Sequence, residues 1–332
     1  MILILSQDVY EPTTELVMDW IRALGGDCVR IASADLMGRV PFEMGVDGEG
    51  AFVRFEVDGR QFSDRDVKAV WLRRWQLPRE FGVRKPAGFE EVATEISRHL
   101  AREASALSAA VYAFFPRARW LTHPDEASLS KLAALRAAVA AGLEVPATLV
   151  SSRRAEIEAF RARHGRVITK PVGEVTFFSL GMRSFGLYTA EPGDREVAAL
   201  PDLGFPSLVQ ELVEKAFEIR SFYLDGGLHS MAIFSQLDEQ TALDFRQYNA
   251  RRPNRAVPYR LPDGVARAAR TFMRSVGLTS GSIDLIRTPD GRHVFLEVNP
   301  AGQFLMVSNP CNYRLEKVVA QSLMKRVSHA DA

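Results

Sequence analysis

Apolar residues recur along this chain at two spacings, and these spacings predict an ordered series of strands and helices. Residues 1–5 are continuously apolar and predict a buried strand, and residues 13–24 then place apolar side chains on one helical face. Further strands are predicted at 28–31, 51–57 (turning at Asp58-Gly59) and 67–72, followed by a long helix at 89–114. This first part is predicted to form a small α/β unit.

The remainder of the chain alternates differently, with many short strands between three helices. A helix is predicted after Pro124, with Asp125 or Ser128 as its cap and Gly142 as its end. Strands are predicted at 167–169, 207–213, 218–224 and 228–236, hairpins within 173–190, and helices at 265–276 and 313–324. This order favours α+β lobes behind the α/β start.

One predicted hairpin near the C-terminus carries three polar side chains suited to a metal. Asp284 lies in a strand over 282–286, and Glu297 and Asn299 lie two residues apart in the next strand, so they share a face. Two carboxylates about 4 Å apart repel by roughly 4 kcal/mol at an effective dielectric constant near 20. The hairpin therefore either binds a cation such as Mg²⁺, which prefers oxygen ligands, or turns its acids into water.

Polar residues upstream of the hairpin form a consistent set for nucleotide chemistry. Lys131 and Lys170 could hold phosphate oxygens as point charges. The run Gln210-Glu211-Leu212-Val213 could offer backbone groups to an adenine edge, and Glu218 could accept from ribose hydroxyls. Arg220 and Arg246 could bind a carboxylate or phosphate, and Asp244 is the nearest candidate for a general base.

Composition and charge restrict the class of protein further. The 332 residues are 47% hydrophobic and 25% charged, as in an ordinary folded chain. The formal charge of +1 gives no global field for nucleic acid, and no segment is long enough to span a membrane. Cys28 and Cys311 form neither a disulfide framework nor a zinc spacing, and no signal peptide is evident, so a cytoplasmic location is expected.

Taken in order, these residues resemble the ATP-grasp superfamily over about 116–325. The resemblance implies an α+β ATP-grasp fold of two lobes, 118–209 and 210–332, behind a small α/β pre-ATP-grasp domain, 1–117. It implies ATP and Mg²⁺ as cofactors and an ADP-forming ligase. The implied nucleotide-binding residues are Lys131, Lys170, Gln210, Glu211, Leu212, Val213 and Glu218, and the implied metal ligands are Asp284, Glu297 and Asn299.

A narrower resemblance is to the graspetide synthetases, which close side-chain rings in ribosomally made peptides such as the microviridins. The stretches that are similar are Trp71-Leu72-Arg73-Arg74, Trp120-Leu121-Thr122-His123-Pro124, Ile233-Phe234-Ser235-Gln236, Asp244-Phe245-Arg246 and Glu297-Val298-Asn299-Pro300-Ala301-Gly302-Gln303-Phe304. The opening, with Ser6-Gln7-Asp8 and Pro12-Thr13-Thr14-Glu15, is most similar to the grasp-with-spasm branch. Two positions depart from relatives in the wider superfamily: residues 173–179 replace a glycine-rich phosphate loop, and Ser282 replaces an arginine.

The implied reaction joins a peptide Asp or Glu carboxylate to a Ser or Thr hydroxyl, or to a Lys amine, through an acyl phosphate. The implied partner is a precursor peptide whose leader segment docks on the enzyme, with residues 173–200 as the candidate surface. No nucleic acid or membrane partner is expected, and a homodimer is left open.

Other hypotheses remain at this point. The chain could be an ATP-grasp ligase joining a carboxylate to an amine on a small molecule or protein tail, or a nucleotide-binding module without catalysis. Individual residues could also have ordinary structural roles: Lys131 could be a solvated helix lysine, and Arg73 and Arg74 could flank a strand. The basic run 246–260 is expected to be a loop that meets an acidic peptide or a solvated face.

Overall fold

The computed structural model describes residues 1–7, 11–48, 50–75, 77, 81, 88–173, 177–180, 183–186, 188–237 and 251–330. Within it the chain forms two compact units. The first comprises Met1–Ala127 with Arg314–Ala332, and the second comprises Ser128–Tyr313.

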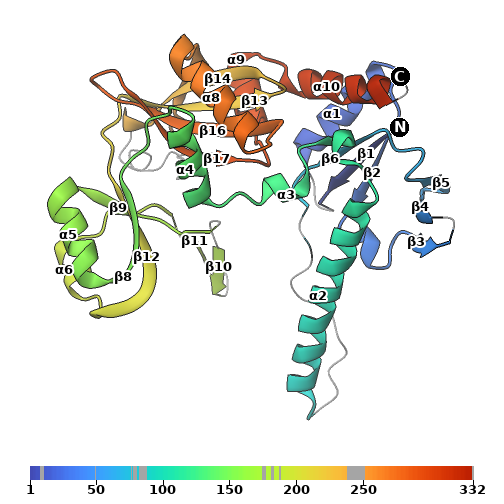
Figure 1. Ribbon diagram of the computed structural model, residues 1–332, viewed down its shortest axis with the longest axis horizontal. Coiled ribbons are helices and arrows are strands. Elements are labelled where there is room, and N and C mark those ends of the chain that lie inside the picture. The colour runs from blue at the N-terminus through green and yellow to red at the C-terminus, as the bar shows by residue number, and fades with distance from the viewer. Residues whose placement is uncertain are drawn as a thin grey trace. The chain divides into compact units, whose positions relative to one another are not determined.

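The first unit is built on a parallel four-stranded sheet in the order β2-β1-β6-β7 (Figure 1). Its strands are β1 (Ile2–Ser6), β2 (Cys28–Ala32), β6 (Ala69–Leu72) and β7 (Trp120–Leu121), and an antiparallel sheet joins β3 (Phe42–Asp47), β4 (Gly50–Val57) and β5 (Arg60–Ser63). Its helices are α1 (Pro12–Ala23), α2 (Glu90–Ala113), α3 (Pro124–Ala127) and α10 (Leu315–Ala330), with short 3-10 turns at Asp35–Met37 and Arg117–Arg119.

A buried ion pair lies beside the carboxyl ends of β1 and β6. Nη2 of Arg73 is 3.3 Å from Oε1 of Glu11, and both side chains are almost fully buried. Glu11 also caps helix α1, because its Oε2 accepts from the backbone N–H and the hydroxyl of Thr14. Burial would raise the pKa of Glu11, but the charge of Arg73 and the hydrogen bonds from Thr14 and Thr13 hold it below its usual value. Burial lowers the pKa of Arg73 to about 10, so it stays charged at neutral pH.

The second unit contains a five-stranded antiparallel sheet in the order β15-β14-β13-β16-β17 and smaller sheets. The five strands are β13 (Phe217–Leu224), β14 (Gly227–Phe234), β15 (Arg255–Tyr259), β16 (Ser280–Arg287) and β17 (His293–Asn299). The smaller sheets are β8-β12-β9, from β8 (Thr148–Arg153), β9 (Val167–Thr169) and β12 (Leu203–Glu211), and the hairpin of β10 (Phe177–Leu180) with β11 (Arg183–Gly186). The helices are α4 (Lys131–Ala140), α5 (Arg154–His164), α6 (Asp194–Ala198), α8 (Asp263–Ser275) and α9 (Leu305–Cys311), with a 3-10 turn at Ser235–Leu237.

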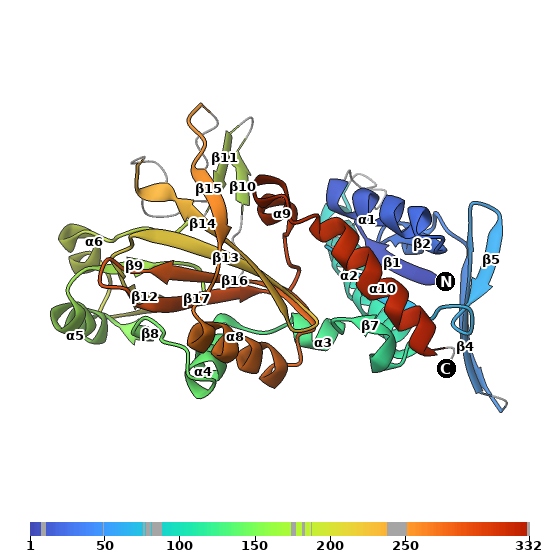
Figure 2. The same cartoon turned by 90° about the horizontal axis from the view of Figure 1, so that it is seen from above.

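Helices α4 and α8 cover one face of the five-stranded sheet (Figure 2). Their residues Leu135 and Phe272 pack in one buried cluster with Ile219, Leu285 and Phe295 of the strands. Each strand therefore gives alternate side chains to this core and the intervening ones to the opposite face. That opposite face carries the polar residues of interest.

Most of the expected elements are present, and the differences have local causes. The helix expected after Pro124 is interrupted: α3 ends at Ala127, and α4 starts after Ser130, whose hydroxyl accepts from the N–H of Ala133. The cap is therefore Ser130, and the expectation of Asp125 or Ser128 was wrong. Residues 255–259, expected in a loop or solvated face, form β15, because β14 offers them an edge. The polar helix α5 has only one fully buried residue, Ile157, and gave little periodic signal.

The chain ends with a helix that belongs to the first unit. Helix α10 packs against α1 and carries the buried residues Leu315, Val319 and Leu323. The expected division had placed residues up to 332 in the third domain, whereas the structure groups Arg314–Ala332 with the first unit. The division of the remainder into lobes at 209/210 stays a prediction.

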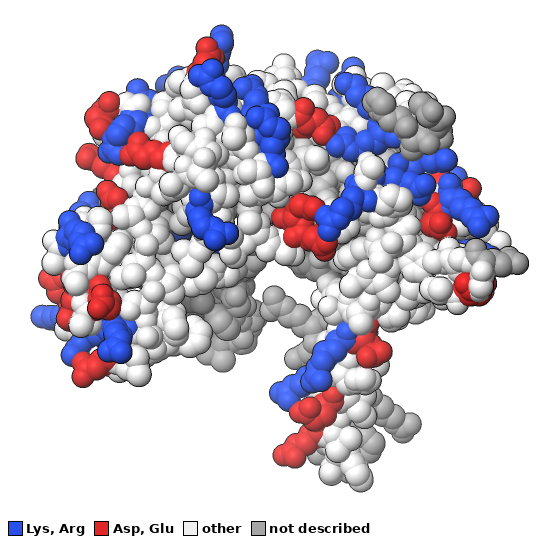
Figure 3. Space-filling model, viewed as in Figure 1, with Lys and Arg blue, Asp and Glu red and all other residues white. Residues whose placement is uncertain are grey.

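Charges of both signs are mixed over the face drawn in Figure 3, in keeping with the near-zero net charge. Among the helices described, none combines the length and apolar character that crossing a bilayer requires.

Replacing Glu11 by Ala should destabilise the first unit strongly, because it leaves the Arg73 charge buried and removes a helix cap. We expect a loss of about 3–5 kcal/mol in the free energy of unfolding, measured by denaturant titration. The control Asp19→Ala, on the same helix, removes an exposed pair with Arg22 and should change it by less than about 1 kcal/mol. Because the pKa of Glu11 is depressed in the folded state, the contribution is complete above its ordinary pKa of 4.5 and is lost as pH falls through the folded pKa. Equal effects of the two variants would contradict the assignment.

Candidate active site

Three charged residues lie in one row across three adjacent strands. The register pairs Arg220 of β13 with Asp284 of β16, and Asp284 with Glu297 of β17. Directly paired residues on neighbouring antiparallel strands point to the same face, with Cβ atoms about 4.5–5.5 Å apart. Asn299 lies opposite Ser282, one step along the same face. The structure thus brings together the three predicted metal ligands and one predicted catalytic arginine.

An irregularity in β17 allows this row to coexist with the core. The register shifts by one residue between the Asp284–Glu297 pair and the next pair, Leu285–Phe295, so Leu296 is an extra residue in β17. Strict alternation would put Phe295 on the same face as Glu297. The bulge instead turns Phe295, which is fully buried, into the core and leaves Glu297 in the row.

A second local feature brings β17 close to β16 near Asn299. A side chain at Gly281 would place its Cβ 3.3 Å from the backbone oxygen of Asn299 and 3.2 Å from the side chain of Met273. Glycine therefore permits the close approach that sets Asn299 beside the row.

The row is screened from water at one end and accessible at the other. Arg220 is 4% exposed and Asp284 9%, and Nη1 of Arg220 lies 3.6 Å from Oδ2 of Asp284. Glu297 and Asn299 are half-buried. The row contains two carboxylates and one guanidinium, and a divalent cation would add positive charge beside the two acids.

The donor set fits Mg²⁺ by its chemistry. Two carboxylates and a side-chain amide supply only oxygen ligands, and the remaining positions can be taken by water or phosphate. Within the described part of the chain, no three His, Cys, Asp or Glu side chains cluster as a metal site. A cation here would therefore need Asn299 as well as the two acids.

The two predicted phosphate-binding lysines lie at the same loop. Lys170 follows directly after β9, and Nζ of Lys131, at the start of α4, donates to the backbone oxygens of Pro171 and Gly173 at 2.7 and 2.6 Å. Strand β9 pairs with β12, whose last residues are Gln210 and Glu211. The loop after β9 (the lysine loop) and residues 210–213 (the connector) are thus joined to the same small sheet.

Hydrogen bonds to neighbouring segments hold part of the connector in place. The N–H of Glu211 donates to Ala147, and the N–H of Leu212 donates to Arg166. Gln210 is buried and donates from Nε2 to the hydroxyl of Thr148, while Leu212 and Val213 are half-buried. These contacts fix the backbone that was expected to face adenine.

Glu218, expected at a ribose, is buried on the same face as Arg220. Its Oε1 accepts from the hydroxyl of Ser235 at 2.7 Å and forms an ion pair with Lys215. Lys215 was not singled out from the sequence, because outside a helix a spacing of three residues gives no charge-pair signal. Asp244 and Arg246 lie outside the described residues.

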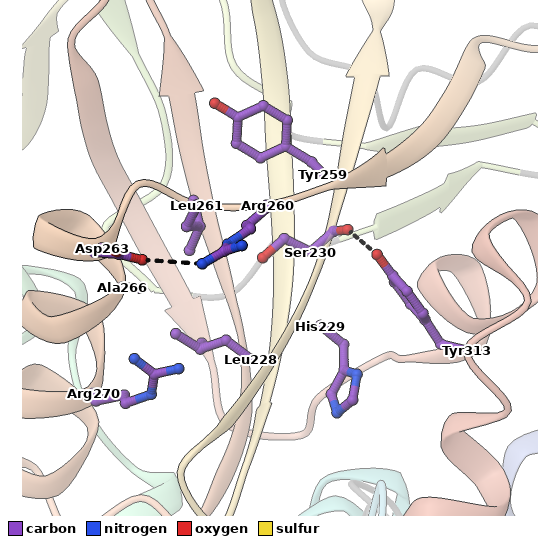
Figure 4. A pocket seen from close by; sticks show the side chains of 10 residues that line it. All are labelled: Leu228, His229, Ser230, Tyr259, Arg260, Leu261, Asp263, Ala266, Arg270 and Tyr313. Carbon is purple, nitrogen blue, oxygen red and sulfur yellow. Dashed lines mark hydrogen bonds and ion pairs between the residues drawn. The ribbon is translucent and has the colours of Figure 1, made fainter.

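A pocket of about 260 Å³ occurs elsewhere in the second unit, where β14 extends beyond β15 (Figure 4). Its walls include Leu228, Tyr259 and Tyr313, with Arg260 paired to Asp263 at its rim. None of the row residues lines it. We place the candidate site at the row, because the chemistry and the register converge there.

Comparison with solved structures identifies the fold. The macrocyclase MdnC of Microcystis aeruginosa MRC, bound to precursor peptide MdnA, is 23% identical and superposes with a TM-score of 0.83, covering 98% of this chain and 99% of that one. A RiPP-associated ATP-grasp ligase of Chryseobacterium gregarium, in complex with ADP and a leader and core peptide, is 21% identical with a TM-score of 0.84, covering 98% and 96%. The ATP-grasp ligase PsnB, with precursor peptide PsnA2 and AMPPNP, is 20% identical with a TM-score of 0.74, covering 98% and 97%.

This chain has the fold of these ATP-grasp ligases. The fold expected from the ordered residues is thereby confirmed across nearly the full length, including the first unit. No protein-family model and no curated protein sequence matches the chain. The likeness lies in structure at low sequence identity, so it was accessible from the sequence only through short motifs.

Replacing Arg220 by Met should make the stability of this chain depend on Mg²⁺. Without the guanidinium, Asp284 and Glu297 repel each other by up to about 4 kcal/mol, which a bound divalent cation relieves. We expect a lower melting temperature in EDTA that Mg²⁺ restores, measured by circular dichroism. The control Arg287→Met, at the end of the neighbouring strand β16, should show no such recovery. If the melting temperature of Arg220→Met is the same with and without Mg²⁺, the assignment of Asp284 and Glu297 as metal ligands is wrong.

Proposed function

We propose that this protein is an ATP-dependent macrocyclase that forms side-chain ester or amide links in a ribosomally made precursor peptide. The observation that carries the proposal is the cross-strand row of Arg220, Asp284 and Glu297, with Asn299 beside it, in an ATP-grasp fold. Structures of the same fold that contain precursor peptides support the choice of substrate.

Nucleotide and metal are assigned to residues of the second unit. Lys131 and Lys170 would hold phosphate oxygens, because Lys170 begins the loop after β9 and the side chain of Lys131 reaches the same loop. The connector Gln210-Glu211-Leu212-Val213 would hold adenine and Glu218 the ribose. Asp284, Glu297 and Asn299 would hold Mg²⁺, which supplies charge neutralisation at the transferring phosphoryl group. Neighbours of this fold that contain ADP and Mg support this assignment.

The proposed reaction has two steps. A side-chain carboxylate of the peptide attacks the γ-phosphorus of ATP, which forms an acyl phosphate and releases ADP. A Ser or Thr hydroxyl, or a Lys amine, then attacks the acyl carbon and expels phosphate, and its proton passes to a base. The enzyme contributes mainly by holding the reactants and stabilising charge.

Arg220 is the described residue best placed to meet the acyl phosphate, because it is buried in the row beside Asp284. Arg246 and Asp244 are retained as proposed substrate and base residues from the sequence alone. The proposed leader-docking surface, 173–200, includes the hairpin of β10 and β11. We propose the cytoplasm as the compartment, because Cys28 and Cys311 are both free thiols.

The second candidate is a ligase that joins a carboxylate to an amine on a small molecule or protein tail. D-cycloserine synthetase DcsG shares the fold with a lower TM-score of 0.55 and 18% identity, which favours the peptide substrate. Mass spectrometry separates the two: ring closure removes one water per link, whereas ligation adds the mass of the second reactant.

Asp284→Ala and Asn299→Ala should each abolish ring formation, because each removes an oxygen ligand from the proposed Mg²⁺ site. The measurement is the loss of water from a Thr- and Glu-rich precursor incubated with the protein, ATP and Mg²⁺. Both variants should keep the far-ultraviolet circular dichroism of the wild type. Ring formation at the normal rate in either variant would show that the replaced residue is not a required Mg²⁺ ligand. The absence of ADP release with every peptide tried would favour a non-catalytic nucleotide-binding module.

Lys170→Ala should weaken ATP binding at least about tenfold, because a charged contact to phosphate contributes about 1.5–3 kcal/mol. Isothermal titration with a non-hydrolysable ATP analogue measures the change. Lys68→Ala, in the first unit, serves as a matched control and should bind as the wild type does. An unchanged affinity in Lys170→Ala would refute the phosphate role of this lysine.

A further inference from the structure

The pocket drawn in Figure 4 lies where strand β14 continues past the end of β15. The last pair between these strands joins Ser230 to Tyr259, so residues 227–229 of β14 form an edge that no described strand covers on that side. This edge, helix α8 and Tyr313 surround the cavity of about 260 Å³. The cavity therefore combines an open strand edge with side chains from neighbouring elements.

The backbone of Leu228 faces this open edge. Met231 lies opposite Pro258 of β15, and because proline has no N–H, this pair cannot exchange two hydrogen bonds. The next pair along, Ser230 with Tyr259, is therefore the hydrogen-bonded kind, in which Ser230 directs its N–H and C=O toward β15. Every second residue of a strand directs its backbone groups to the same side. Leu228 thus presents its N–H and C=O to the edge, beyond the point where β15 ends.

A residue added at this edge would place its side chain in the cavity. Leu228 points toward helix α8, because it packs against the buried cluster that includes Ala269 and Phe272 of that helix. In an antiparallel pair, residues directly opposite each other point to the same face. A residue opposite Leu228 on a further strand therefore directs its side chain toward α8, and Arg270 lines the cavity from that helix.

Arg270 supplies positive charge at this position. Its Nε donates to the backbone oxygen of Gly226 at 2.8 Å, which holds the guanidinium beside the start of β14 and leaves the Nη groups to bind another acceptor. Arg260 at the rim is 3.5 Å from Asp263, and both side chains are largely exposed, so this pair is weak. Burial lowers the pKa of His229, which is therefore neutral at neutral pH. The cavity thus offers two guanidinium groups against one rim carboxylate, which favours an anionic ligand.

We propose that this pocket binds an extended peptide segment that carries an Asp or Glu side chain. The segment adds to β14 as an antiparallel strand, and its acidic residue lies opposite Leu228 and exchanges two backbone hydrogen bonds with it. The carboxylate binds the guanidinium of Arg270, with Arg260 at the rim. An acidic peptide supplies both the backbone amides and the anion, whereas a free carboxylate or phosphate supplies only the anion. The proposal is independent of the proposed function, because binding here uses neither nucleotide nor the residues of the row.

The first test compares two peptides on the full chain without nucleotide. A short capped peptide with Glu at its centre should bind, and the same peptide with Gln at that position should bind at least about tenfold more weakly, because it lacks the charge that Arg270 recognises. Isothermal titration measures both affinities. No binding of the Glu peptide at millimolar concentration, equal affinity for the two peptides, or binding of glutarate as tight as that of the Glu peptide would overturn the proposal.

The second test assigns the binding to the pocket. Arg270→Met should weaken the Glu peptide at least about tenfold and leave the Gln peptide unchanged, because both changes remove the same contact. Arg267→Met, at an exposed arginine of the same helix that does not line the cavity, should bind as the wild type does. Arg260→Met removes an exposed rim charge without disturbing a buried contact and should weaken the Glu peptide about threefold. Equal affinities of the Arg270 and Arg267 variants would place the binding elsewhere.

The third test examines the strand pairing. N-methylation of the central Glu of the peptide removes the N–H that donates to the oxygen of Leu228, and should weaken binding at least about tenfold. N-methylation of the following residue, whose N–H points away from β14, should leave the affinity within about threefold. Equal effects of the two methyl groups would refute strand addition, even if Arg270 binds the carboxylate.

Discussion

The site depends on the register between β13, β16 and β17. Because Asp284 pairs with Glu297 on one side and with Arg220 on the other, two carboxylates and one guanidinium are forced into a single row on one face of the sheet. A shift of one residue would turn every member of one strand to the other face. The register is set by the core on the opposite face, where Ile219, Leu285 and Phe295 pack under α4 and α8.

The core and the row require Phe295 and Glu297 of β17 to point to opposite faces of the sheet, and the bulge at Leu296 allows this. Phe295 fills the core, and Glu297 and Asn299 face the site, although regular alternation would not allow both. Close approach at Gly281 then brings Asn299 beside the acids. If these residues bind a cation, as proposed, the packed sheet already holds their oxygens in place, which reduces the cost of ordering them.

Elsewhere the chain uses buried charge in a different way. In the first unit, Glu11 and Arg73 satisfy each other and fix the start of α1 beside the parallel sheet. In the second, Arg220 and Asp284 are similarly buried, and the half-buried Glu297 lies next to them. The first pair joins a helix cap to a sheet, whereas the second row is the one proposed to bind a cation.

The sequence by itself determined most helices and strands, the hairpin that carries Asp284, Glu297 and Asn299, and the ATP-grasp resemblance, because these follow from local periodicity and from residue order. It did not determine the bulge in β17, the strand β15, the cap at Ser130 or the placement of α10, since each depends on which distant segment offers an edge or a surface. The pairing of Arg220 with Asp284 also depends on a distant segment, because β13 and β16 are far apart in the sequence. Local pattern reports which side of a strand is apolar, but only packing between segments far apart in the sequence decides which strands become neighbours, and in which register.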